Sequence, residues 1–332
     1  MIQGHTKINK REGILASKYV MNPHLINGLK YDLRVYVLVT CFCPLKVYIY
    51  DDGLVRFATE KYTNDPSTLT KKFVHLTNFS INKKNIKFVK NTDKTKAQGG
   101  DEDEETGNDS SKWDFKMLRK AFEKQGHNFS YVMAQFKDLI VKTLISVEPH
   151  IVANLQKNPT NRVNCFEIYG FDIMIDSNMK PWVLEVNVLP SLSSSSPFDK
   201  RIKTMLVCDS LTLVGIRGYD KTKFHAQSTE LLGLAPFAQS MQYGELRQKQ
   251  MFDGTEKLTK DELELLMDLD EEYMRRGHFD RIYPLTNKAF FYEQFFEYKR
   301  YQNCLISVYI NTPDNIRDKV LAKHKRVYFS EV

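Results

Sequence analysis

The sequence predicts an α+β fold, in which antiparallel strands form one sheet and helices flank it. Apolar stretches with a two-residue period are followed closely by turn residues, which is typical of hairpins. Longer stretches with a helical period lie between and after them. Hairpins are expected over residues 44–59, with a turn at Asp51-Asp52-Gly53, and over 165–192. Helices are expected over 113–126, 131–148 (ended by Pro149), 199–213 and from residue 259 onward.

The stretch from Cys165 to Leu192, CFEIYGFDIMIDSNMKPWVLEVNVLPSL, carries the strongest functional signal. It is predicted to form two largely apolar strands joined by a polar turn. If Asp176 pairs with Pro181, Asp172 lies directly opposite Glu185. Like charges in such a pair destabilise a sheet unless something neutralises them.

A bound cation would remove this repulsion. Asn187 leaves the return strand on the same face as Glu185, two positions away. Mg²⁺ takes carboxylate and carbonyl oxygens together with substrate phosphates. We therefore interpret Asp172, Glu185 and Asn187 as the ligands of a metal–nucleotide site. The alternative is a solvent-facing strand pair whose acids have no role, although unpaired carboxylates are costly in strands as apolar as these.

A second row of charge is expected on the strand KYDLRVYVLVT. Lys30, Asp32 and Arg34 lie two positions apart and therefore share one face. The row is either the solvated edge of a sheet or part of the same site. Further along, Thr77 and Asn78 end an ordered element, where they either contact the nucleotide and metal or cap a helix.

The composition is that of an ordinary soluble globular protein with a moderate excess of positive charge. Of 332 residues, 42% are hydrophobic and 27% are charged. The net charge of +7, from 48 Lys and Arg against 41 Asp and Glu, favours acidic partners. The five cysteines include no CxxC pair, so neither a zinc site nor a disulfide framework is predicted. No signal peptide is recognised, and no apolar stretch approaches the roughly 18 residues of a membrane span.

The chain is expected to divide into three parts. Residues 1–217 hold the strands and helices above, residues 218–257 are polar and are interpreted as a linker, and residues 258–332 are expected to be helical. The last part opens on a capping box at Thr259. Within the first part, residues 85–112 contain an acidic run with glycines and serines and are expected to form a solvated loop.

Six motifs in a fixed order resemble those of the tubulin-tyrosine-ligase-like family, most closely its polyglutamylase members. They are KYDLRVYVLVT, DGLVRFAT, HLTNFSINKK, SKWDF, GFDIMID and KPWVLEVNVLPSL, spread over residues 15–217. The resemblance implies an ATP-grasp fold, of which residues 1–217 form the C-terminal part. It also implies a helical appendage after this core, which is expected to contact microtubules.

The resemblance implies an ATP-dependent carboxylate–amine ligase, with ATP and Mg²⁺ as cofactors, that glutamylates tubulin. ATP would activate the γ-carboxylate of a glutamate in an acidic tail of α- or β-tubulin as an acylphosphate. The amine of free L-glutamate would then attack it and form an isopeptide bond. The protein would contribute positioning and charge neutralisation. We expect a monomer in the cytoplasm, on the cytoskeleton and at the cilium or basal body, with no nucleic-acid partner.

The resemblance also assigns roles to individual residues. Those expected to bind the nucleotide are Ser17, Lys18, Tyr19, Val20, Lys30, Asp32, Thr77 and Asn78. Those expected to bind the incoming free glutamate are Arg56, Phe79, Ser80, Lys112 and Lys203. Those expected to bind Mg²⁺ are Asp172, Glu185 and Asn187, and those expected to act directly in catalysis are Arg34, Lys30 and Glu185. Without the resemblance, Lys112 and Lys203 would be taken for surface lysines.

The sequence departs from the family pattern in ways that change the expectations. It lacks, before the hinge at Ser17, the strand and the phosphate-binding loop of the family, so we expect an N-terminally truncated ligase with weak or no activity alone. Phe79 stands in place of a common tyrosine, and Leu189 in place of a usual serine. The alternatives are an inactive module that binds tubulin, a ligase that adds glycine, and a nucleic-acid binder suggested only by the net charge and the basic patch of Lys323, Lys325 and Arg326.

Overall fold

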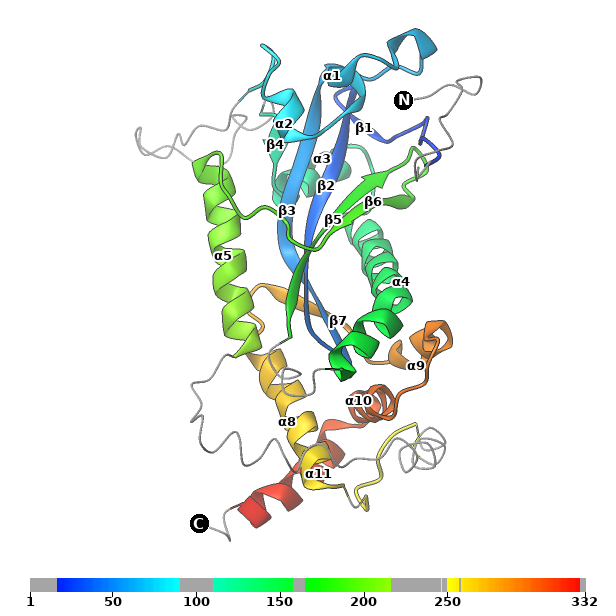
Figure 1. The fold of residues 1–332 in the computed structure, drawn as a ribbon, viewed down its shortest axis with the longest axis vertical. Helices are drawn as coiled ribbons and strands as arrows, with labels where there is room; N and C mark the ends of the chain where they lie inside the picture. The colour runs from blue at the N-terminus through cyan, green and yellow to red at the C-terminus, as the bar shows by residue number, and fades with distance from the viewer. Residues whose placement is uncertain are drawn as a thin grey trace.

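An antiparallel sheet flanked by helices forms the part of the chain that the computed structural model describes, residues 17–89, 110–157, 165–215, 246, 250–256 and 258–328. Seven strands lie in the order β4-β3-β2-β5-β6, with β1 beside β2 and β7 beside β3 (Figure 1). All of these strand pairs are antiparallel. The predicted α+β class with a mainly antiparallel sheet is therefore confirmed.

The elements of the described residues have the following bounds. The strands are β1 Leu25–Ile26, β2 Leu29–Phe42, β3 Leu45–Lys61, β4 Lys112–Trp113, β5 Glu167–Ile175, β6 Pro181–Asn187 and β7 Phe279–Tyr283. The α-helices are α1 Lys72–His75, α2 Phe79–Asn82, α3 Phe115–Lys124, α4 Phe129–Gln156, α5 Pro197–Val214, α8 Lys260–Met274, α9 Ala289–Tyr292, α10 Tyr301–Asn311 and α11 Asp314–Tyr328. Short 3₁₀ turns cover η1 Pro66–Thr68 and η4 Glu293–Phe295.

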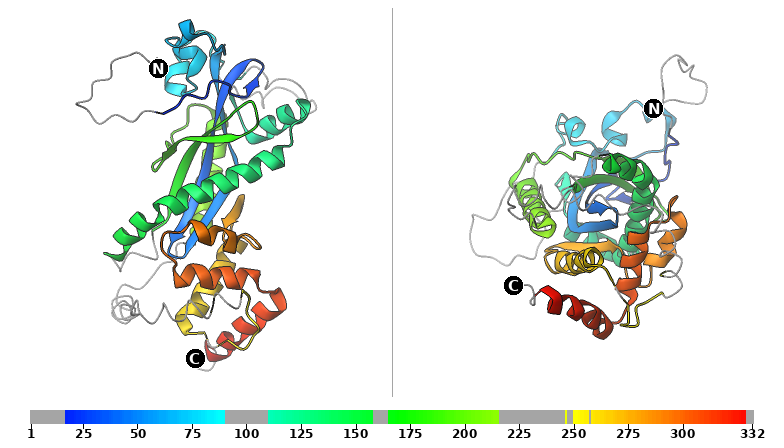
Figure 2. Two further views of the ribbon diagram at one scale, coloured as in Figure 1. Left: turned by 90° about the vertical axis from the view of Figure 1, so that its right-hand side faces the viewer. Right: turned by 60° about the horizontal axis from the view of Figure 1, so that its bottom comes forward.

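The two faces of the sheet are covered by different helices. Leu33 and Val35 of β2 point into a core shared with α3 and α4, and α4 crosses this face diagonally (Figure 2, left). Tyr36 and Leu38 point the other way, against apolar residues of α5. This follows from the two-residue period of a strand that is buried on both sides. On the α5 face the residues before Tyr36 are polar, so that end of the face is available for a site.

The first hairpin turns at a different place from the predicted one. β3 continues through Asp51-Asp52-Gly53, and the turn between β2 and β3 lies at Cys43-Pro44. The predicted turn is instead a bulge within β3. Gly53 is needed there for close packing, because a Cβ would lie 2.5 Å from the Arg34 carbonyl oxygen and 2.6 Å from Cζ of Phe115. Bulges and turns both favour Asp and Gly, so the sequence signal did not distinguish them.

The second hairpin brings the predicted acids together through a different register. Asp172 of β5 lies opposite Glu185 of β6, as predicted. Near the turn, however, Pro181 pairs with Ile175 and not with Asp176, which accepts hydrogen bonds from the turn residues. A bulge beside Asp172 takes up the one-residue difference. Without this bulge, a one-residue slip would place the two acids on opposite faces.

The predicted helices form, with one clear difference in length. The helices expected from 113, 199 and 259 correspond to α3, α5 and α8, and the capping box of α8 is present. The prediction that Pro149 ends a helix is wrong, because α4 continues to Gln156. Ile145 and Val152 are buried on either side of the proline. Burying two such side chains contributes about 3–6 kcal/mol, which offsets the roughly 3 kcal/mol that an internal proline costs.

The sequence predicted that residues 258–332 are helical, and this is only partly right. Its strand β7 pairs with β3 and extends the sheet. Glu272 of α8 is buried, forms an ion pair with Lys46 and accepts a hydrogen bond from Thr40 Oγ1 at 2.7 Å. The segment is therefore joined to the sheet by backbone pairing and by buried charge. The three-part division of the chain remains a prediction, since most of residues 218–257 lie outside the described residues.

Three further predictions concern the cysteines, membrane-spanning helices and the acidic loop. No disulfide joins any of the five cysteines, all of which lie in the described residues. Among the described helices we find none with the length and apolarity that crossing a bilayer requires. Most of the expected acidic loop, residues 90–109, lies outside the described residues.

Candidate functional site

The charged row of β2 lies on the same face as α5, next to the β5–β6 hairpin. Lys30, Asp32 and Arg34 alternate with core residues as predicted, and Asp172 pairs with Arg34 across the strands. Arg34 donates Nε to Oδ1 of Asp172 at 2.5 Å and Nη2 to Oδ2 at 3.2 Å. Gly170 gives the arginine room, since a Cβ there would lie 3.1 Å from Arg34 Cδ. The row is thus a buried, ion-paired network and not a solvated edge.

A second arginine, Arg56, links Asp32 and Asp172. Arg56 of β3 donates Nε and Nη2 to Asp32 at 2.7 and 2.6 Å, and Nη2 also lies 2.9 Å from Oδ2 of Asp172. Thr77 donates its hydroxyl to Asp32 at 2.7 Å. Burial alone would raise the pKa of Asp172, but Arg34 and Arg56 hold it below its usual range. Asp172 is therefore ionised, and the arginines orient both carboxylates.

Lys30 occupies the end of the row. Its ammonium donates to the carbonyl of His75 at 2.9 Å and to the Tyr19 hydroxyl at 3.0 Å, and it lies 4.6 Å from the Tyr19 ring centroid. Burial lowers the pKa of Lys30 to about 8, against the opposing charge of Asp32. Its hydrogen-bond partners are uncharged oxygens, so its positive charge remains available to an anion such as a phosphate.

The other predicted nucleotide residues lie at the margin of this network. Tyr19 and Val20 are half-buried, whereas Ser17 and Lys18 are exposed. Asn78 is exposed and precedes α2 without a side-chain capping bond. Thr77 therefore belongs to the site through Asp32, while the role of Asn78 stays a prediction.

The predicted metal ligands offer oxygen donors on neighbouring positions. Glu185 is exposed, and its Oε1 accepts a hydrogen bond from Nδ2 of Asn187 at 3.3 Å. Asp172 already accepts two hydrogen bonds from Arg34 and forms an ion pair with Arg56, which leaves part of its roughly four lone-pair positions for a ligand. In the described part of the chain no three His, Cys, Asp or Glu side chains form a metal cluster. The set fits Mg²⁺, which commonly uses one or two carboxylates plus substrate phosphates, better than a cation held entirely by protein.

Lys112 is held in the site and is not a surface lysine. It lies opposite Arg56 in the β3–β4 register and is 7% exposed. Its ammonium donates to Oδ2 of Asp199 at 2.7 Å and to the Ser195 hydroxyl at 3.0 Å, and it lies 4.1 Å from the ring centroid of Phe79. The surface-lysine interpretation is therefore wrong for Lys112.

Lys203 is also drawn into the site, from α5. It is 9% exposed and donates to the Ser193 carbonyl at 2.5 Å. Burial lowers its pKa, Asp199 opposes this, and Lys112 adds to it. Both predicted lysines contact the turn from Ser193 to Ser195. Ser80, which was predicted to bind the same substrate, is exposed.

Two residues of the site were not predicted. His75 holds Lys30 through its carbonyl, and its ring accepts or shares hydrogen bonds with Tyr19 and Thr68 at 3.0 and 3.2 Å. Asp199 holds Lys112, as given above. Only Asp199 had a usable signal, since it lies four positions before Lys203 on a predicted helix and therefore on the same side.

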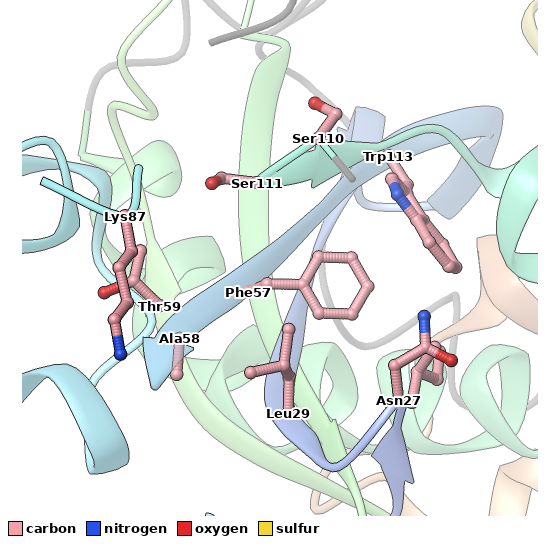
Figure 3. A pocket seen from close by; sticks show the side chains of 10 residues that line it. Asn27, Leu29, Phe57, Ala58, Thr59, Lys87, Ser110, Ser111 and Trp113 are labelled. Carbon is pink, nitrogen blue, oxygen red and sulfur yellow. The ribbon is translucent and has the colours of Figure 1, made fainter. Parts of the chain in front are cut away.

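A pocket of about 170 Å³ lies beside the ends of β1, β3 and β4 (Figure 3). Leu29, Phe57 and Trp113 line it, together with Ile26, Asn27, Ala58, Thr59, Lys87, Ser110 and Ser111. Phe57 and Trp113 alternate with Arg56 and Lys112 along their strands and belong to the core on the α3–α4 side. None of the predicted site residues lines this pocket, so we do not place the candidate site there.

Known proteins with similar sequences were compared with this chain. The human tubulin monoglutamylase TTLL4 (Homo sapiens) is 37% identical over 328 residues, covering 92% of this chain. The mouse tubulin polyglutamylase TTLL5 (Mus musculus) is 34% identical over 333 residues, covering 92%. A probable beta-tubulin polyglutamylase of Tetrahymena thermophila is 35% identical over 301 residues, covering 89%. The matches take up 26%, 24% and 23% of those proteins, so the chain spans about a quarter of their length.

The family-level comparison agrees with the motifs and with the sheet that carries them. Residues 1–222 match the family described as "Tubulin-tyrosine ligase family", which is more than half of the 332 residues. The match includes β2, β3, β5 and β6, whose charged residues form the candidate site. This chain belongs to the tubulin-tyrosine ligase family.

Proposed function

We propose that this chain is the ligase core of an enzyme that uses ATP to join free L-glutamate to glutamate side chains in acidic tubulin tails. The observation that carries the proposal is the single sheet face on which Asp172 and Glu185 lie with Arg34, Arg56 and Lys112, and to which α5 adds Lys203. Such a face serves both a metal-bound nucleotide and an amino acid with two carboxylates. Relatives named as tubulin monoglutamylases and polyglutamylases support the same reaction class.

One end of the face suits the nucleotide. Bound ATP would supply the phosphoryl group that activates a carboxylate. Glu185 and Asn187, with Asp172, would hold Mg²⁺ through oxygen donors. Lys30 and Arg34 would neutralise phosphate charge, Arg34 with a planar fork that matches phosphate oxygens.

The other end suits the incoming amino acid. Lys112 and Lys203 are buried cations that reach one turn, at Ser193 to Ser195, from two elements. A dicarboxylic amino acid supplies two anions to them, whereas glycine supplies one. Phe79 closes one side by lying under the Lys112 ammonium. Glutamate is therefore proposed over glycine.

A second candidate is a tubulin-binding module without catalysis. It is favoured by one observation, that the Asp172 carboxylate already accepts two hydrogen bonds from Arg34 and forms an ion pair with Arg56. A cation would have to share this carboxylate with two arginines. The lysines and arginines of this sheet face would attract acidic tails in either case.

Mass spectrometry of tubulin tails distinguishes these proposals. The 332-residue chain is incubated with microtubules, Mg·ATP and isotopically labelled L-glutamate or glycine. We expect slow incorporation of glutamate, none of glycine, and none by Glu185→Gln, whose side chain keeps its shape and loses its charge. Microtubule binding without incorporation would favour the second candidate, and incorporation of glycine would refute the proposed substrate. We further propose that the protein acts on microtubules of the cytoplasm and cilium, which a fluorescent fusion would test.

A further inference from the structure

Asp199 is a buried carboxylate to which no role has been given so far. It lies in the first turn of α5, where its backbone N–H donates to the N-cap Ser196 at 3.2 Å, and it is 1% exposed. Its Oδ2 accepts from Lys112 Nζ at 2.7 Å, from the Ser195 hydroxyl at 2.5 Å and from the Ser195 N–H at 3.2 Å. Burial alone would raise the pKa of Asp199, but these donors keep it below its usual range. The group is therefore a fixed anion.

The contacts of Asp199 connect the two lysines of the amino-acid end. Lys112 comes from β4, and Lys203 follows Asp199 by one helical turn on α5. Lys203 donates to Ser193 of the turn whose Ser195 is bonded to Asp199. Asp199 thus fixes Lys112 and the turn relative to each other, and through the turn it also fixes Lys203.

Asp199 is also the counter-charge at this end of the site. The charged groups that act on Lys203 are Asp199 on one side and Lys112, Arg34 and Arg56 on the other. Three cations near a buried lysine favour loss of its proton. Asp199 opposes that loss, and so keeps Lys203 able to bind a carboxylate.

We propose that Asp199 is a positioning residue for the incoming amino acid, which acts through Lys112 and Lys203 and makes this end of the site selective for a dicarboxylic substrate. The inference rests on the proposed function, because it needs this end of the sheet face to bind the amino acid. In the described structure Oδ1 of Asp199 is buried without a hydrogen-bond partner. A carboxylate that leaves one oxygen unsatisfied in the interior is costly, so we attribute its presence to the lysines that it holds.

The test measures L-glutamate binding to the 332-residue chain by calorimetry in the presence of Mg²⁺ and a non-hydrolysable ATP analogue. In Asp199→Asn we expect the dissociation constant for L-glutamate to rise about 10- to 100-fold, the effect of losing a charge-assisted bond. The affinity for the analogue should stay within about twofold, which a general loss of structure would not allow. Ser195→Ala, a milder change to the same turn, should weaken L-glutamate binding less.

The matched control lies on the same helix. Asp209→Asn removes another hydrogen-bonded aspartate of α5, about 15 Å further along the helix axis, and should leave L-glutamate binding unchanged. A double-mutant cycle with Lys112→Met gives the second readout. If Asp199 acts through Lys112, the double variant should bind L-glutamate about as weakly as Lys112→Met alone.

The outcomes separate this inference from the proposed function. Wild-type binding of L-glutamate that Asp199→Asn leaves intact would overturn the inference and leave the proposed function standing. Parallel loss of analogue affinity and thermal stability in Asp199→Asn would assign it a structural role and also overturn the inference. Fully additive losses in the cycle would do the same. If the wild-type chain binds the analogue but no L-glutamate, the proposed function fails, and this inference fails with it.

Discussion

Buried charge is arranged in two different ways in this protein. Away from the candidate site the buried charges form separate pairs, such as Glu148 of α4 with Arg300, the residue before α10. At the candidate site the charges are shared, because Asp172 accepts from both Arg34 and Arg56. A separate pair has no second partner, so removing one member leaves an isolated ion in the interior. A shared network can transfer one hydrogen bond to a ligand and keep the others.

The site also has more cations than its acids can pair. Lys30 and Lys203 donate to uncharged oxygens, although both are nearly buried. Desolvating an ion that forms no direct ion pair is unfavourable for the fold. We therefore expect the separate pairs to stabilise the fold, and the unpaired lysines to bind ligands at a cost in stability.

The largest expected effect is on the separate pair. Arg300→Met removes both hydrogen bonds to Glu148, which is 0% exposed. An ion left unpaired in the interior typically costs about 3–5 kcal/mol. We expect a loss of that size in the free energy of unfolding, measured by urea denaturation at pH 7.

The control for this prediction is an exposed pair attached to the same helix. Lys137 of α4 lies 3.0 Å from Asp280, and the two side chains are 36% and 62% exposed. Lys137→Met should cost no more than about 1 kcal/mol. Similar losses in the two variants would contradict the idea that burial gives the separate pair its importance.

The next prediction concerns a site residue that should matter for binding and not for folding. Glu185 is exposed and accepts a hydrogen bond from Asn187. Glu185→Gln should change the free energy of unfolding by less than about 0.5 kcal/mol, as surface substitutions usually do. The Mg²⁺-dependent part of ATP affinity should fall at least about tenfold, because a carboxylate ligand becomes an amide. Calorimetry with and without Mg²⁺ would measure it, and equal affinities in the two proteins would exclude Glu185 from the metal site.

The strand period made much of the site predictable from sequence. Lys30, Asp32 and Arg34 had to share a face, and an antiparallel pair placed Asp172 opposite Glu185. Such statements depend only on the alternation of side chains along a strand. The roles proposed for these residues came from the family motifs, because the period of a strand indicates only which face a side chain lies on.

The parts that could not be predicted depend on contacts between distant segments. His75 reaches Lys30 through a backbone carbonyl, an atom that every residue has, so its sequence carries no signal. The addition of β7 to β3 joins residues more than two hundred positions apart. The bulges at Gly53 and beside Asp172 follow from local packing and register, and their residues are also typical of turns and strands.

The third prediction tests the cost of a surplus cation. Lys30 has a pKa of about 8 in the folded chain, against about 10.4 when unfolded. Between these values the unfolded chain binds more protons, so this residue makes the folded state gain stability as pH rises, by about 3 kcal/mol at most. Lys30→Met should lack that gain. As pH rises from 7 to 10.5, wild type should therefore gain unfolding free energy relative to Lys30→Met. A difference that stays constant over this range would refute the cost assigned to burying the Lys30 charge.

The smallest expected effect belongs to an exposed separate pair. His278 Nδ1 lies 2.8 Å from Oδ2 of Asp209, and the histidine side chain is 54% exposed. The hydrogen bond to Asp209 raises the pKa of His278, with further help from the charge of Asp51 and against partial burial. Because the folded chain holds this proton more tightly, the contribution to stability is complete below the unfolded pKa of about 6.5 and is lost as pH rises through the raised value.

His278→Asn should therefore lower the thermal midpoint more at pH 5.5 than at pH 8.5, by an amount that solvent screening keeps small. Asp209→Asn should remove the same pH dependence, because it removes the partner that raises the pKa. A pH-dependent loss as large as that of Arg300→Met would show that pairing alone gives a charge its effect on folding. A small pH-dependent loss would show that pairing stabilises this fold strongly only where the charge is also buried. The charges of the candidate site are buried, so its paired residues should stabilise the fold, whereas its lysines without a direct ion pair should destabilise it.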